Sequence, residues 1–264
     1  MSNDVSITAE ESSSILGPAQ SATAPAPAGS APAGAPGTAP APAEPSEELL
    51  AEIAEADARL ADAPASEVIR WAVERFGDDV VVASSFQDCV LIDVAVGVHP
   101  GIEVLFLDTK FHFPETLEFV ETCRTIFAPL NLTVLEPGPG AAAWPCGSAR
   151  CCETRKVLPL NKHLTSRKAW ITGLKRVDTP ERTDAPIVSW DAARGVVKIN
   201  AVAPWTDEDI AGHIAEHGLP EHPLIAKGYA SIGCAPTTRP VGEGEDPRAG
   251  RWSESDKTEC GLHA

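Results

Sequence analysis

The sequence is most informative at Asp79-Val-Val-Val-Ala-Ser84-Ser85-Phe86-Gln87-Asp88, where an apolar run meets a short polar turn. Consecutive β-branched residues without polar alternation are typical of a strand buried on both faces, as in a parallel sheet. A helical pattern then resumes at Cys89-Val-Leu-Ile-Asp-Val-Ala. Strand, turn and helix in this order predict the first half of a strand–helix–strand unit.

The same unit recurs along the chain. A turn at Pro100-Gly101 leads into the apolar strand Val104-Leu-Phe-Leu107, and another helix is predicted to start at Pro114. Further strands are predicted at residues 132–135 and 169–172. We therefore expect an α/β fold with a doubly wound, mostly parallel sheet and helices on both faces. Ligands bind such sheets beyond the carboxyl ends of the strands.

The ends of the chain differ in composition from the segment that carries the sheet. From Pro18 to Pro45 there are eight prolines among alanine, glycine and serine. Such a segment cannot bury enough apolar surface to offset the entropy lost on ordering. We expect residues 1–45 to be a disordered Ala/Pro-rich tail, residues 46–240 to form the α/β domain, and residues 241–264 to be a mobile C-terminal segment.

Charge and cysteine content limit the classes of partner. A net charge of −17 argues against general affinity for nucleic acids or membrane surfaces. No apolar run approaches the ~20 residues of a membrane span, and the first residues lack the features of a secretory signal. Seven cysteines, an odd number with one adjacent pair, do not match a secreted disulfide framework. We expect a cytoplasmic protein with neither nucleic-acid nor membrane partners.

Two polar turns that follow predicted strands are candidate binding sites. Ser84 and Ser85 place small hydroxyls and backbone amides at a helix N-terminus, which favours an anion, although small polar residues also simply turn a chain. The loop Gly173-Leu-Lys-Arg-Val-Asp-Thr-Pro-Glu-Arg182 carries three basic residues, among them Arg176. A solvated loop is the alternative there, and its position at the carboxyl end of a strand favours a phosphate site.

Three cysteines stand in settings that suit a metal centre. Cys151 and Cys152 are adjacent, and adjacent cysteines seldom bond to each other because the bridge strains the intervening peptide. Cys234 lies in a turn rich in glycine and proline. These three thiols favour iron–sulfur over zinc only mildly. The cysteines of the predicted helices, Cys89 and Cys123, are expected to be small core residues.

The C-terminus carries a cysteine in an unusual place. Cys260 lies within Lys257-Thr-Glu-Cys-Gly-Leu-His263, close to the end of the chain. Chain ends are usually exposed, and a free thiol avoids the surface unless its reactivity is used. We interpret Cys260 as a nucleophile on a mobile segment that reaches into a pocket of the α/β domain; a stray terminal cysteine is the alternative.

A series of motifs runs in order from about residue 66 to residue 263. They are Ser84-Ser85-Phe86, Leu105-Phe-Leu-Asp108-Thr109, Cys151-Cys152 with Arg155-Lys156-Val157, Gly173 to Arg182, His222-Pro-Leu224, Gly228-Tyr-Ala-Ser-Ile-Gly-Cys234, Arg248-Ala-Gly-Arg251-Trp252 and Lys257 to His263. Together they resemble the assimilatory adenylyl-sulfate (APS) reductases, within the wider APS/PAPS reductase family of adenine-nucleotide α-hydrolase-like fold. The cysteine pair with a third cysteine resembles the APS branch, because the branch that prefers the 3′-phosphorylated substrate (PAPS) typically lacks these ligands.

The resemblance implies an activity. It implies reduction of adenosine 5′-phosphosulfate to sulfite and AMP, in assimilatory sulfate reduction and cysteine biosynthesis. Cys260 would attack the sulfur of APS and form an S-sulfocysteine, and thioredoxin or a similar dithiol protein would then release sulfite. By the same resemblance the phosphosulfate would be bound by basic residues, with two serines near the nucleotide: Lys156, Arg248, Arg251, the further candidate Arg176, Ser84 and Ser85.

The resemblance also implies a [4Fe-4S] cluster, and here the sequence departs from the family. The family pattern is an adjacent cysteine pair followed by Cys-x-x-Cys, which Cys151, Cys152 and Cys234 match in part. Thr237 stands at the fourth position, and a hydroxyl is a poor iron ligand compared with a thiolate. Three alternatives stay open: Cys146 substitutes for the missing ligand, the cluster keeps an open and labile iron, or the cluster is absent.

Two other functions stay open beside the APS reductase. A PAPS reductase is favoured if the substitution at Thr237 abolishes the cluster. A non-catalytic sensor that binds a nucleotide or a cluster is the other. The presence of Cys260, Arg248 and Arg251 speaks against the sensor, because a binding module would not need the nucleophile.

Overall fold

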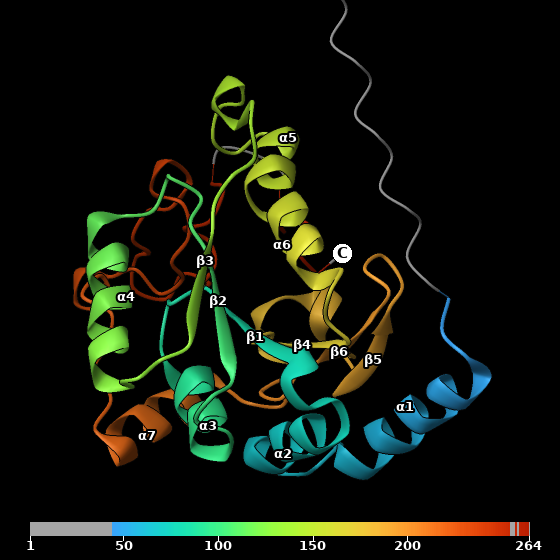
Figure 1. Ribbon diagram of the computed structural model, residues 1–264. Helices are drawn as coiled ribbons and strands as arrows, with labels where there is room; N and C mark the ends of the chain where they lie inside the picture. The colour runs from blue at the N-terminus through green and yellow to red at the C-terminus, as the bar shows by residue number, and fades with distance from the viewer. Residues whose placement is uncertain (1–43, 254–256, 258, 264) are drawn as a thin grey trace, which may run out of the picture. The chain divides into compact units, whose positions relative to one another are not determined.

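The computed structural model describes residues 44–253, 257 and 259–263, so the predicted tail at 1–45 lies almost wholly outside the described residues. Within them, six strands form one sheet in the order β3-β2-β1-β4-β6-β5 (Figure 1). All neighbouring strands run parallel except β5, which is antiparallel to β6. The strands are β1 Val80–Ser84, β2 Glu103–Leu107, β3 Leu132–Leu135, β4 Ala169–Thr172, β5 Val188–Asp191 and β6 Val196–Ile199.

Alternate residues of the strands enter two separate cores. Val80 and Val82 of β1 join the larger core, whereas Val81 between them joins the smaller core on the opposite face. This alternation follows from the pleat of a strand, which points successive side chains to opposite faces. Both faces are apolar because both are covered. The prediction of a doubly wound, mostly parallel α/β sheet is confirmed.

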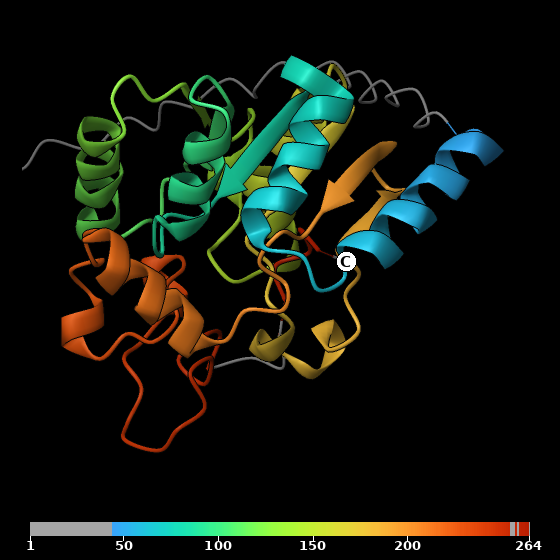
Figure 2. The same cartoon turned by 90° about the horizontal axis from the view of Figure 1, so that it is seen from below.

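Four helices follow one another across the face of the larger core (Figure 2). The first of them begins at the N-cap Ser46, whose hydroxyl accepts a hydrogen bond from the Leu49 amide at 3.1 Å. Their apolar side chains form the larger core together with one face of the strands. The four are α1 Glu47–Leu60, α2 Ala65–Phe76, α3 Val90–Val98 and α4 Pro114–Ile126.

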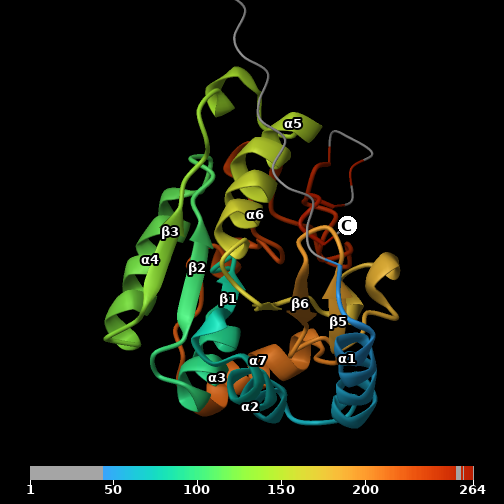
Figure 3. The same ribbon diagram turned by 45° about the vertical axis from the view of Figure 1, so that its right-hand side comes forward.

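The opposite face is covered by α6 (Leu158–Leu164), which lies across the sheet from α2 and α3 (Figure 3). Leu160 and Leu164 of α6 are fully buried there against Trp170. Leu262, from the C-terminal segment, packs against the same core. The C-terminal segment therefore completes the smaller core, which ties its position to the sheet.

The four predicted strands correspond to β1, β2, β3 and β4. The strands β5 and β6 and the helix α7 (Asp207–His217) were not predicted from the sequence. Both strands are four residues long, and Lys198 and Asp191 interrupt their apolar pattern. The residues of β6 are identified as a strand by their pairing with β4 and not by their local sequence. No helix in the described part of the chain is both long enough and apolar enough to cross a membrane.

Candidate active site

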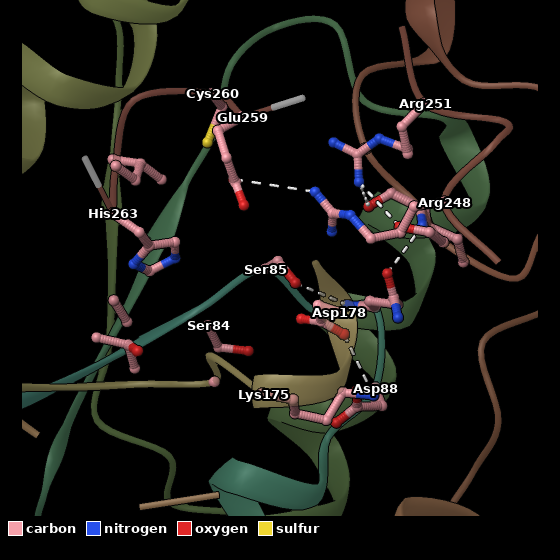
Figure 4. Close-up of a pocket in the computed structure, with 18 of the residues that line it drawn as sticks. Ser84, Ser85, Asp88, Lys175, Asp178, Arg248, Arg251, Glu259, Cys260 and His263 are labelled. Atoms are coloured by element: carbon pink, nitrogen blue, oxygen red, sulfur yellow. Dashed lines mark hydrogen bonds and ion pairs between the residues drawn. The ribbon is translucent and has the colours of Figure 1, made fainter. Parts of the chain in front are cut away.

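A cavity of about 250 Å³ lies at the carboxyl ends of β1, β2 and β4. Ser84 of β1, Leu107 of β2 and Thr172 of β4 border it, as expected for an open parallel sheet. Figure 4 shows Cys260 and Glu259 on one side of this cavity, facing Arg248 and Arg251 on the other. Segments more than 170 residues apart in the sequence thus share one pocket.

The turn after β1 has a constrained backbone. Phe86 adopts a left-handed φ of 55°, is fully buried, and packs edge to face on Phe106 with ring centroids 5.3 Å apart. Its amide donates to the Ser84 hydroxyl at 3.1 Å. This packing holds a backbone conformation that is costly for a non-glycine residue, and it keeps Ser84 and Ser85 at the border of the cavity.

The N-terminus of α3 is less open to an anion than the sequence suggested. The Asp88 carboxylate accepts a hydrogen bond from the Val90 amide at 3.0 Å. Burial raises the pKa of Asp88, against the lowering effect of this hydrogen bond. A carboxyl group therefore takes the amide that a phosphate would use, so this part of the cavity suits a hydroxyl or a base better than a phosphate.

The cationic side of the cavity includes Lys156, which comes from a π-helix at Glu153–Val157 directly after the cysteine pair. π-helical turns are rare and often occur at functional sites. Lys156 borders both this cavity and a second, smaller one that contains the cysteines. Burial lowers the pKa of Lys156, but the negative charges of Cys260 and Cys234 outweigh burial and raise it overall.

The neighbouring Arg155 has a different environment. It is buried, and its guanidinium donates to the carbonyls of Thr109 at 2.8 Å and Ala141 at 2.9 Å. Its Cζ also lies 4.2 Å from the ring centroid of Phe111. Arg155 therefore supports the backbone around the site, whereas Lys156 faces the cavity.

Arg251 is held in place by the loop at residues 231–233, which has a glycine where the guanidinium passes it. Its guanidinium donates to the Ser231 hydroxyl and to the Ile232 carbonyl, both at 3.2 Å. A Cβ atom added to Gly233 would lie 2.3 Å from Arg251 Nη2, so glycine is needed where the guanidinium crosses the loop. Burial and the nearby charge of Arg248 lower the pKa of Arg251.

The basic loop after β4 contributes to the cavity through residues other than Arg176. Arg176 is not among the described residues that border it, and its Nε donates to the Ala185 carbonyl at 2.9 Å. Lys175 and Arg182 border the cavity instead. Lys175 pairs with Asp207 and Asp178. Burial lowers the pKa of Lys175, but the hydrogen bonds and charges of these two carboxylates together outweigh burial and raise it.

The C-terminal segment is docked on the cavity by several contacts. Arg182 Nη2 lies 2.6 and 2.7 Å from the two carboxylate oxygens of Glu259, the residue before Cys260. The ring of His263 stacks on Trp170, with centroids 5.9 Å apart and planes 5° from parallel. Burial lowers the pKa of His263, as do the cations around it. Lys257 Nζ donates to Cys152 Sγ at 3.0 Å, which links this segment to the cysteine pair.

The predicted metal ligands gather around the second cavity. Cys151, Cys152 and Cys234 are buried there, and Cys146 and Thr237 border the same space. A side-chain hydrogen bond from Cys146 lowers the pKa of Cys234 to about 4, and the Lys156 charge assists. The same contact raises the pKa of Cys146. Cys89 and Cys123 lie in the larger core, which confirms them as core residues.

The spacing of these thiols bears on the kind of metal centre. Among the described residues, the group of three or more ligand atoms that lie within 4.8 Å of one another is Asp93, His213 and His217, with no cysteine in it. A single zinc ion binds thiolates at about 2.3 Å, which brings its ligand atoms to within about 4 Å of one another. No three of the described cysteine sulfurs therefore lie as close together as the ligands of a single zinc ion, although Cys146 and Cys234 are in hydrogen-bond contact, and this arrangement suits a cluster of several iron atoms.

Comparison with known proteins identifies the family. Residues 79–240 match the sequence model of the phosphoadenosine phosphosulfate reductase domain. The chain belongs to this family. Curated relatives named adenosine 5′-phosphosulfate reductase include one from Mycobacteroides abscessus, 47% identical over 78% of this chain and 91% of the relative. Another, from Mycolicibacterium smegmatis, is 46% identical over 82% of this chain and 96% of the relative.

Solved structures agree on the fold of this reductase family. A phosphoadenylyl-sulfate (PAPS) reductase from Candida auris superposes with a TM-score of 0.64 at 23% identity, over 75% of this chain and all of that one. An FMN adenylyltransferase from Candida glabrata gives a TM-score of 0.52 at 14% identity, over 78% of this chain and 73% of that one. At these identities the likeness shows the fold alone. It confirms the expected adenine-nucleotide α-hydrolase-like fold.

Several residues of the reductase site were not predicted from the sequence. Glu259 directly precedes Cys260 and Lys257 lies three residues before it, but nothing in their spacing indicates a docking role. The stack of His263 on Trp170 joins the C-terminus to β4. Lys175 and Arg182 were indicated only as two of the three cations in the loop from Gly173 to Arg182. The site residues that the sequence did not indicate are Asp88, Trp170, Gly233, Lys257 and Glu259.

Proposed function

We propose that this protein is an adenosine 5′-phosphosulfate reductase, which converts APS to sulfite and AMP. The observation that carries the proposal is the position of Cys260, which borders the same cavity as Lys156, Arg248 and Arg251. A nucleophilic thiol opposite three cations suits a substrate with an electrophilic sulfur on an anionic leaving group. The curated relatives named APS reductase, at 47% and 46% identity, support the same activity.

The three cations are proposed to bind the phosphosulfate group. Lys156 and Arg251 are partly buried, and Arg248 lies across the cavity from Cys260 (Figure 4). Cations in a largely dry site neutralise the charge that develops on the leaving phosphate. Ser84, Ser85 and Asp88 lie nearer to the carboxyl end of β1, where they suit the nucleoside part of the substrate.

The reaction needs three successive displacements by thiolates. In the first, the Cys260 thiolate attacks the sulfuryl sulfur, an S–S bond forms, the S–O bond to phosphate breaks, and AMP leaves with the electron pair. In the second, one thiolate of a thioredoxin-like dithiol attacks Sγ of the resulting S-sulfocysteine and sulfite leaves. The other thiol of the partner then resolves the mixed disulfide and restores the Cys260 thiolate. The dithiol supplies both electrons and is oxidised to a disulfide.

The second displacement requires the C-terminal segment to leave the cavity. Cys260 is only partly exposed when the C-terminal segment is docked. Glu259 and His263 hold the segment in that position through their contacts with Arg182 and Trp170, respectively. A partner protein cannot reach a thiol that faces a cavity of this size. We therefore treat residues 241–264 as a segment that closes over APS and opens toward the reductant.

The thiols around the second cavity fit an iron–sulfur cluster. The residues that would hold it are Cys151, Cys152 and Cys234, which are buried and more widely spaced than zinc ligands. When bound, a [4Fe-4S] cluster would supply structural support and an electrostatic field, since the thiols already provide both electrons. Lys156 and Arg251 border both cavities and would be positioned by the protein around it.

The setting in the cell follows from this chemistry. The sulfur of sulfite is still oxidised relative to the sulfur of cysteine, and assimilation must reduce it further. We therefore propose a role in sulfate assimilation and cysteine biosynthesis. The described cysteines are unpaired, and a dithiol reductant operates in a reducing compartment. Both points support the cytoplasm.

Mass spectrometry of the intact protein tests the function. Anaerobic incubation of the full chain with APS, in the absence of reductant, is expected to add one sulfonate to Cys260 and to release an equal amount of AMP. Cys260→Ser should give neither product. If the iron-replete wild-type protein forms no adduct, the proposed function is wrong.

A PAPS reductase remains the second candidate, because the substitution at Thr237 favours it if the cluster is lost. Adduct formation measured in parallel with APS and PAPS separates the two. We expect APS to react faster at equal concentration. Faster reaction with PAPS would assign the chain to the other branch.

A further inference from the structure

Cys146 and Thr237 come together at the cavity that contains the buried cysteines. Cys146 Sγ lies 3.9 Å from Thr237 Oγ1, although the residues are 91 positions apart. Both border the cavity with Cys151, Cys152 and Cys234. A fourth thiol thus lies beside the threonine, on the same space as the other three.

The backbone of the Cys146 segment is shaped for this approach. Gly147, the next residue, has a left-handed φ of 90°, and a Cβ atom there would lie 3.1 Å from Thr237 Cγ2. That contact is tighter than side chains normally allow, so a glycine lets the segment close against Thr237. The side chain at 237 is therefore packed against the turn that presents Cys146.

The same segment is attached firmly to the cysteine pair. Ser148 is the N-cap of α5 (Ala149–Cys152), and its hydroxyl accepts from the Cys151 amide at 3.1 Å and donates to the Pro145 carbonyl at 2.9 Å. Arg150 of α5 lies over the ring of Trp144, 5.1 Å from its centroid. Cys146 is therefore held between two contacts to the helix that carries Cys151 and Cys152.

Thr237 itself is poorly suited to bind iron. Its hydroxyl donates to the Cys234 carbonyl at 3.4 Å, and its amide donates to the same carbonyl at 3.0 Å. A neutral hydroxyl is a hard, weak ligand for iron compared with a thiolate. Thr237 thus closes the turn after Cys234 and leaves the fourth coordination position to another side chain.

We propose that Cys146 supplies the fourth thiolate of the iron–sulfur cluster, together with Cys151, Cys152 and Cys234. This inference rests on the cofactor of the proposed function and deepens it, because it gives the cluster a complete set of four cysteines despite Thr237. The ligand has moved from the turn after Cys234 to the turn before Cys151. Both turns border one cavity, so the exchange needs no change in the rest of the fold.

Metal analysis and spectroscopy of the full chain, purified without oxygen or reconstituted with iron and sulfide, test this inference. We compare the wild type with Cys146→Ser, Thr237→Cys, the double variant, and Cys123→Ser as a buried-cysteine control. Iron and sulfide per chain, visible absorption and Mössbauer spectra are the measurements. Cys146→Ser is expected to lose most of its iron, or to retain a cluster with one spectroscopically distinct iron that a chelator removes. The double variant should recover iron content, and Cys123→Ser should match the wild type.

Three results would overturn the inference. The first is a Cys146→Ser protein with the iron content and Mössbauer spectrum of the wild type. The second is loss of iron in Cys146→Ser that the double variant does not recover. The third is a folded wild type that binds no iron under any of these conditions. The sulfonate adduct on Cys260 is measured separately, so a protein that reacts with APS without iron disproves this inference alone, and a cluster protein that does not react disproves only the proposed function.

Discussion

Arg182 and Glu259 form an ion pair in which Arg182 Nη2 lies within 2.7 Å of both carboxylate oxygens. Glu259 is the residue before Cys260, and Arg182 ends the basic loop after β4. The side chain of Glu259 is 22% exposed and that of Arg182 is 10% exposed. This pair joins the C-terminal segment directly to the carboxyl edge of the sheet, so it controls where the thiol lies.

Glu259→Gln is therefore expected to slow transfer of the sulfonate to Cys260. Loss of a charged hydrogen bond costs about 1.5–3 kcal/mol, less where solvent screens the pair, so we expect about a tenfold lower rate at saturating APS. Single-turnover mass spectrometry measures this rate. Glu245→Gln, which breaks the exposed pair with Arg239, is the matched control and should react like the wild type. An equal rate in both variants would show that the Arg182 pair does not position the segment.

Gly233→Ala is expected to weaken APS binding without unfolding the protein. The new methyl would overlap the Arg251 guanidinium, and the flexible arginine rather than the backbone should move. Displacing one charged hydrogen-bond donor costs about 1.5–3 kcal/mol, which corresponds to about a tenfold or greater increase in KM. Steady-state kinetics and thermal unfolding are the measurements.

Gly212→Ala is the matched control for that substitution. Gly212 lies in α7 with nothing within 4 Å of the added Cβ, and alanine favours a helix by about 0.5–1 kcal/mol over glycine. This variant should keep the wild-type KM and unfold at the same or a slightly higher temperature. A wild-type KM in Gly233→Ala would contradict the role given to the Gly233 and Arg251 contact.

Lys156 and Arg155 are adjacent in the sequence, but their substitution is expected to affect different properties: activity for Lys156 and stability for Arg155. Lys156→Met should lower kcat/KM for APS by about two orders of magnitude or more, as loss of a cation at a developing charge does, and leave the fold intact. Arg155→Met leaves the carbonyls of Thr109 and Ala141 without their buried donor. It should lower the unfolding free energy by about 2–3 kcal/mol.

Denaturant unfolding and kinetics on both variants separate these effects. An Arg155→Met protein of wild-type stability would show that its two carbonyl contacts are not needed for the fold. A Lys156→Met protein with wild-type kcat/KM would exclude Lys156 from the substrate site.

The folded protein is expected to lose stability in mild acid because of the buried His222. It is buried, its ring bonds the Thr116 hydroxyl at 3.0 Å and accepts from the Leu224 amide at 3.1 Å, and burial lowers its pKa to about 4. The unfolded chain binds a proton near pH 6.5 that the folded chain binds only near pH 4. Stability is therefore full above about pH 6.5 and falls as the pH drops toward 4, by about 2–3 kcal/mol.

Urea unfolding between pH 4 and pH 7 measures this dependence. His222→Gln should be less stable at pH 7 but should show a shallower decline toward pH 4, because the titrating ring is gone. Parallel declines in the two proteins would assign the acid sensitivity to other groups. The same result would leave His222 as a packing residue without a role in the pH dependence.

The sheet and the family could be predicted from sequence because their signals are local. The apolar run at residues 80–83 and the repeated strand and helix pattern specify buried parallel strands by themselves. The short strands β5 and β6 could not be predicted, since their apolar residues are interrupted and their identity depends on pairing with β4.

The candidate site was predictable only in part, for a related reason. Cys260, Arg248 and Arg251 stand in distinctive motifs, and the structure brings all three to one cavity. Arg176 and Lys175 are neighbours in the same basic loop, and spacing alone could not tell which of them borders the cavity. The direction of Lys175 depends on its acidic partners, Asp178 in the same loop and Asp207 at the start of α7, whereas Arg176 turns toward the Ala185 carbonyl.

By itself the sequence determined the α/β fold, the family and the presence of a thiol near the end of the chain, because composition, periodicity and motifs record these directly. Only the tertiary structure decided which groups act together. It brought Cys146 beside Thr237, Glu259 onto Arg182, and Lys156 between the two cavities. Residues far apart in the chain meet through sheet pairing and loop closure, and no local pattern in the sequence specifies those distances.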